Sequence, residues 1–65
     1  MDNMDNAEVM KNAIDDFREI QEYMFLAKEE NAIKTYAKLK DKYLSLKAIL
    51  NGLGVNLSNI DKVKE

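Results

Sequence analysis

The chain has 65 residues, contains no cysteine, histidine or proline, and carries a formal net charge of −2. Without cysteine and histidine, the sequence excludes disulfides, thiolate chemistry and the common zinc sites. Its length fits one small domain over residues 1–65, and a composition of 46% apolar and 34% charged residues is typical of a folded helical protein.

The first predicted element is a helix over about residues 6–28. Asp5 followed by Glu8 matches a capping box, which places the start of the helix near residue 6. Apolar residues then recur at spacings of three and four, which keeps them on one side of a helix. These residues are Met10, Ala13, Phe17, Ile20, Met24 and Ala27.

The second predicted element is a helix over about residues 32–51. The register of the first helix does not continue past Ala27, because its next positions are all polar, and a second apolar set follows in a new phase. That set is Tyr36, Leu39, Tyr43, Leu46, Leu50 and Leu53. Asn51 and Gly52 tolerate the left-handed conformation that ends many helices, so the second helix is predicted to end near residue 51.

Two apolar stripes of equal length on either side of a break predict an antiparallel hairpin. Folding the chain at the break places Phe17 opposite Leu46 and Ile20 opposite Tyr43. The turn contains neither glycine nor proline, and Asn31 is its one residue suited to a left-handed conformation. A continuous kinked helix exchanged between two chains is the alternative that fits the same pattern.

The third predicted element is a short helix over about residues 59–64. Ser58 and Asp61 have the spacing of another capping box, and so short a helix must dock on the hairpin or fray. The expected fold is therefore all-α, an antiparallel two-helix hairpin with a short C-terminal helical segment.

The charges of the two halves differ in sign. Residues 1–31 have nine acidic and three basic side chains, whereas residues 32–65 have three acidic and seven basic ones. We expect the two helices to attract each other weakly. Lys34, Lys38 and Lys42 form a ridge that can lie along phosphates, although a pI near 5.1 argues against a nucleic-acid partner.

Several apolar residues lie away from both stripes and turn toward one flank of the hairpin. We expect Ile14, Phe25, Ile33 and Leu44 on this flank to bind a second copy or another protein. Two helices alone share a single interface, so the expected assembly is a homodimer that forms a four-helix bundle.

No catalytic, cofactor or metal site is expected. The carboxylates of the first helix lie on its polar faces, and no histidine or glycine-rich phosphate loop accompanies them. The preferred hypothesis is a self-associating, non-enzymatic protein–protein interaction module that acts as a regulator, inhibitor or adaptor without a small-molecule substrate. The alternative is a nucleic-acid-binding regulator that uses the lysine ridge.

The expected location is the cytoplasm of a bacterium or its phage. No apolar run reaches the length of a membrane span, and the acidic residues 1–5 differ from a basic signal peptide. A high content of Lys, Asn and Ile is typical of an AT-rich genome.

Overall fold

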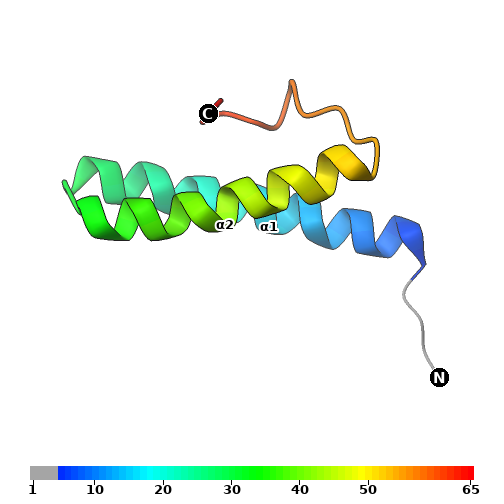
Figure 1. Ribbon diagram of the computed structural model, residues 1–65, viewed down its shortest axis with the longest axis horizontal. Helices are drawn as coiled ribbons and strands as arrows, with labels where there is room; N and C mark the ends of the chain where they lie inside the picture. Colours follow the sequence, from blue (N-terminus) through cyan, green and yellow to red (C-terminus); the bar gives the residue numbers. More distant parts are fainter. Residues whose placement is uncertain (1–4) are drawn as a thin grey trace.

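The protein is described here by a computed structural model over residues 5–65, which form two helices, α1 (Asn6–Glu29) and α2 (Ile33–Gly52). The two helices pack side by side as an antiparallel hairpin (Figure 1), and residues 5–65 contain no strand. Both helices agree with the predicted ranges to within one residue at each end. Residues 1–4, part of the acidic stretch considered above, lie outside the described residues.

The ends of α1 are set by local hydrogen bonds. The Asp5 carboxylate accepts the Glu8 backbone N–H at 2.8 Å, which is one half of the predicted capping box. After α1, Asn31 has a φ of 58°, and the Ala32 N–H donates to the Ala27 carbonyl at 2.8 Å. This geometry is a Schellman motif, so the prediction that Asn31 makes the left-handed turn is confirmed.

The end of α2 differs from the prediction in detail. Asn51 and Gly52 are still helical, and the left-handed residue is Gly54, with a φ of 82°. The Val55 N–H donates to the Leu50 carbonyl at 3.0 Å, which makes a second Schellman motif. The later turn keeps Leu50 fully buried and returns Val55 to the core, and this packing explains the shift.

The core lies along the seam between the helices and continues under the C-terminal residues. Its buried apolar members are Phe17, Met24, Ala27, Tyr43, Leu46, Leu50 and Leu57. The rings of Phe17 and Tyr43 stack with their centroids 5.3 Å apart. Phe17 therefore contacts the residue that the sequence pairing had placed opposite Ile20.

Residues 53–65, which we call the strap, turn back from the end of α2 and run along the hairpin (Figure 1). The helix predicted over residues 59–64 does not form, and that prediction is wrong. The N–H groups of Ile60 and Asp61 both donate to the Leu57 carbonyl and make a single turn. The next N–H groups, those of Lys62 and Val63, donate instead to the side chain of Gln21 on α1. Tertiary hydrogen bonds have replaced those that a short, marginal helix needs.

The left-handed turn at Asn31 gives the first testable prediction. Asn31→Gly should leave the free energy of unfolding unchanged or raise it slightly, because glycine adopts a positive φ without a steric penalty. Asn31→Val should lower it by about 1–2 kcal/mol, since a side chain branched at Cβ is strained there. Urea denaturation of the two variants measures the difference, and equal stabilities would contradict this account of the turn.

Candidate functional site

The strap lies against five side chains of the hairpin, which together we call the strap groove: Gln21 of α1 and Tyr36, Lys40, Tyr43 and Lys47 of α2. Gln21 is only 2% exposed, although glutamine is usually a surface residue. Its Nε2 donates to the Ile60 carbonyl at 2.9 Å and to the Phe17 carbonyl at 3.2 Å. Its Oε1 accepts the N–H groups of Lys62 and Val63 at 2.6 and 3.0 Å. All four hydrogen-bonding positions of the amide are therefore used, three of them by the strap backbone.

Asp61 fastens the strap to α2. This carboxylate is 6% exposed, and its Oδ1 accepts the Tyr43 hydroxyl and the Lys64 N–H, each at 2.8 Å. Its Oδ2 lies 3.0 Å from the Lys47 ammonium. The Tyr43 hydroxyl in turn accepts the Glu65 N–H at 3.0 Å. A buried carboxylate with an ion pair and two hydrogen bonds is stable where an unpaired one is not.

The electrostatics of Asp61 favour its charged form. Burial by itself raises the pKa of this carboxyl, but the Lys64 N–H, the Tyr43 hydroxyl and the Lys47 ammonium together lower the pKa below its ordinary value. The hydrogen bond to Asp61 raises the pKa of Lys47. Each partner thus holds the other in its ionised state.

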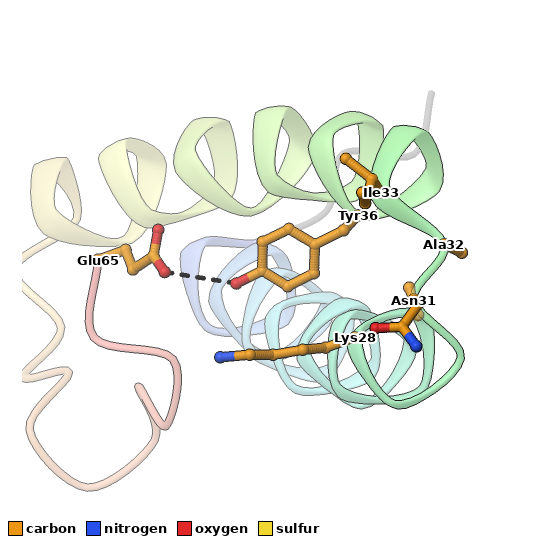
Figure 2. Close-up of a pocket in the computed structure, with 7 residues that line it drawn as sticks. Lys28, Asn31, Ala32, Ile33, Tyr36 and Glu65 are labelled. Carbon is orange, nitrogen blue, oxygen red and sulfur yellow. Dashed lines mark hydrogen bonds between the residues drawn. The ribbon is translucent and has the colours of Figure 1, made fainter.

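Glu65 makes the last contact of the strap, near the hairpin turn. Its carboxylate pairs with the Lys40 ammonium and accepts the Tyr36 hydroxyl at 3.4 Å. The hydrogen bond between Lys40 and Glu65 raises the pKa of Lys40 and lowers that of Glu65. Figure 2 shows the Tyr36 ring and the Lys28 side chain on two sides of a pocket of about 270 Å³, with Glu65 at one end.

The predicted partner flank lies on the side of the hairpin that the strap occupies. Phe25 is exposed and lines a hollow together with Asn59 and Ile60 of the strap. Ile33 is 80% exposed and lines the pocket that has Glu65 at one end. The strap therefore borders both residues.

The other two residues of the flank lie further along the helices. Ile14, two turns before Gln21, is half-buried and packs against the core. Leu44 is 43% exposed and lies within one turn of Lys40 and Lys47. The strap bonds to Gln21 of α1 and to Tyr43 of α2, so it runs over the strip between the two helices on this side. The structure does not bring these four residues into one continuous apolar surface, and their role as a partner face stays a prediction.

The opposite side of the hairpin lacks such a cover among the described residues, and we call it the open face. Tyr23 follows Gln21 by two residues, and Ile49 follows Lys47 by two, so each is turned about 200° from the strap groove. The apolar members of this face with exposed side chains are Val9, Tyr23 and Ile49 of the helices and Leu53, the first residue of the strap, at the end of α2. Ile20, half-buried between the helices, continues the apolar surface.

Charged residues border the open face, and they are acidic on α1 and mainly basic on α2. Asp16 and Glu19 of α1 line a hollow of about 190 Å³ together with Lys42 of α2. Lys38 and Lys42 line a second hollow beside Ile49, together with Asp41, the single acidic residue of α2. One edge of the open face is therefore acidic and the other basic.

The predicted lysine ridge is present as an exposed row on α2. Lys34, Lys38 and Lys42 are all exposed, and no ion pair of theirs occurs within residues 5–65. However, Lys42 shares a hollow with Asp16 and Glu19, so negative charge adjoins one end of the ridge. This arrangement weakens the attraction of the ridge for a phosphate backbone.

The described part of the chain contains no group of three or more acidic side chains placed to hold a metal ion. Neither α1 nor α2 combines the length and apolar character needed to cross a membrane. Within residues 5–65, every buried polar side-chain atom has a hydrogen-bond partner. The polar groups of the strap groove therefore hold the strap and leave no buried donor or acceptor aimed at a ligand.

Sequence reasoning missed Gln21, Asp61 and Glu65. Gln21 looks like any polar helix residue, and Asp61 has the spacing of a helix cap. One signal was available, because Lys40 and Lys47 lie two turns, about 10 Å, apart on one side of α2. Asp61 and Glu65 can span a similar distance in an extended chain.

Comparisons with protein-family models, with curated proteins and with solved structures found no match.

The paired charges predict how docking of the strap depends on pH. The pKa values of Asp61 and Glu65 are lowered in the folded chain, so these carboxylates stabilise docking fully above their unfolded values, about 3.9 and 4.3. That contribution is lost as the pH falls through the folded values. The pKa values of Lys40 and Lys47 are raised, so their contribution persists below about 10.4 and is lost as the pH rises through the folded values.

Chemical shifts of the Lys62 and Val63 amides report strap docking across this pH range. We expect a plateau at neutral pH and release of the strap only in strong acid or strong base. Asp61→Asn should weaken docking at neutral pH and reduce the acid transition. Release with a midpoint above about pH 5 would contradict the assignment.

Proposed function

We propose that this chain is a small non-catalytic protein–protein interaction module that self-associates through its open face. We further propose that it acts as a regulator, inhibitor or adaptor in the cytoplasm of a bacterium or its phage. One observation carries the proposal: the open face combines exposed apolar side chains with an acidic edge on α1 and a basic edge on α2.

The apolar side chains provide the driving force for association. Tyr23 and Ile49 are 52% and 51% exposed and lie on different helices of the same face. Burying such side chains against another apolar surface stabilises a complex by roughly 25 cal/mol per Å² of area removed from water. In a chain this small, the seam and the strap leave these side chains without cover from residues 5–65.

The charges favour a second copy as the partner. The residues of α1 include six acidic and three basic side chains, whereas those of α2 include one acidic and five basic ones. A two-fold axis that lays α1 of one copy on α2 of the other brings the acidic edge of each onto the basic edge of its partner. The result is a four-helix bundle in which each strap lies on an outer side.

This proposal predicts opposite results for two matched substitutions on α2. Ile49→Glu places an unpaired charge in the interface, so the dissociation constant of the dimer should rise by at least about 100-fold, which corresponds to roughly 3 kcal/mol. Leu44→Glu makes the same change at a residue of similar exposure on the strap side and should leave the dimer intact. Sedimentation equilibrium at micromolar to millimolar concentration measures both.

The alternatives give different outcomes in the same measurement. A dimer disrupted by Leu44→Glu and by Phe25→Asp, but not by Ile49→Glu, would identify the flank of Ile14, Phe25, Ile33 and Leu44 as the partner face. A wild-type chain that stays monomeric over the whole concentration range would contradict self-association.

The nucleic-acid alternative is tested by fluorescence anisotropy with random duplex and single-stranded probes. We expect no binding by the wild-type chain even at low salt, because Asp16 and Glu19 adjoin the lysine ridge and the chain has a net negative charge. Tight, salt-sensitive binding that Lys38→Glu abolishes would overturn the preferred function. Lys64→Glu, a change of the same charge outside the ridge, is the matched control.

A further inference from the structure

The contacts that hold the strap do not depend on the covalent link between the strap and its own hairpin. Gln21 bonds to backbone groups of Ile60, Lys62 and Val63, and Asp61 bonds to the side chains of Tyr43 and Lys47. Every one of these bonds joins a hairpin side chain to the last six residues of the strap. The same bonds form whenever a strap of this sequence lies in the groove.

The link itself is a short turn centred on Gly54. Two hydrogen bonds close it, from the Gly54 N–H to the Asn51 carbonyl and from the Val55 N–H to the Leu50 carbonyl, each at 3.0 Å. The φ of 82° at Gly54 directs the strap back over its own hairpin. Because glycine adopts extended conformations as readily, rotation at this one residue redirects the strap away from the hairpin.

We propose that the strap is exchanged between copies, so that the strap of one chain occupies the strap groove of another. The occupant is specified by the groove itself, since three of the four hydrogen-bonding positions of Gln21 bind this backbone and Asp61 supplies the charge that Lys47 pairs with. Two chains that exchange straps reciprocally form a closed two-fold dimer with the same contacts as two closed monomers.

This exchange is separate from the proposed function. Self-association through the open face uses Tyr23 and Ile49, which lie on the side of the hairpin away from the strap groove. The exchange is therefore tested in chains that carry Ile49→Glu, which removes association through the open face. A dimer that Ile49→Glu does not weaken counts against the open face alone, and failed complementation counts against exchange alone.

The test is complementation between two full-length variants. Gln21→Leu breaks the groove and keeps the strap, because it removes the bonds to Ile60, Lys62 and Val63. Asp61→Ala breaks the strap and keeps the groove, because it removes the partner of Tyr43 and Lys47. Neither variant closes on itself as the parent chain does, but the intact strap of the first fits the intact groove of the second.

The readout is NMR of the ¹⁵N-labelled Gln21→Leu chain during titration with the unlabelled Asp61→Ala chain. We expect the Lys62 and Val63 amide resonances to move to their positions in the closed parent chain and to saturate, while translational diffusion slows. Unlabelled Gln21→Leu chain is the matched control and should cause no change. Resonances that stay at the positions of a free strap up to millimolar concentration overturn the proposal.

A second arm covers the case in which a groove variant fails to fold. Gly54→Val makes the closed turn unfavourable and should raise the dimer association constant about tenfold, because a left-handed conformation is strained for valine. Gly52→Val is the matched control, since Gly52 is helical and both glycines have space for a side chain. A Gly54→Val chain that associates no more than Gly52→Val counts against exchange.

Discussion

The hydrogen bonds between Gln21 and the strap backbone are the contact on which the rest of this structure depends. A two-helix hairpin buries one seam, and neither helix can shield the seam from the side. By binding two strap N–H groups and one carbonyl, Gln21 holds Leu57 against the seam, where it is buried with Phe17 and Tyr43. A three-segment core results, although the third segment is not helical.

The two sides of the hairpin therefore differ in how their side chains are covered. On the strap side, charged and polar side chains are paired with strap groups, and specificity comes from their geometry. On the open face, exposed apolar side chains lie between an acidic and a basic edge, and residues 5–65 do not cover them. The chain thus covers one side with its own strap, and the other side is the surface through which we propose that it associates.

Periodicity predicted the parts of the fold that follow from local rules. The two apolar stripes predicted both helices. Asn31 predicted the turn, because few residues adopt a positive φ. The strap could not be derived in the same way, since its conformation depends on partners about 40 residues distant, and a buried Gln21 has the same sequence pattern as an exposed one. The partners of Glu65 and Asp61 are Lys40 and Lys47, and nothing in the periodicity of α2 identifies these pairs.

The long separation between Gln21 and the strap also orders the folding of the chain in time. Its bonds to Lys62 and Val63 span 41 and 42 residues, whereas the turn of the hairpin joins helices that are adjacent in sequence. Contacts with small sequence separation form faster, because less loop entropy is lost in closing them. The contacts next to the hairpin turn are therefore expected to form first, and the bonds between Gln21 and the strap last.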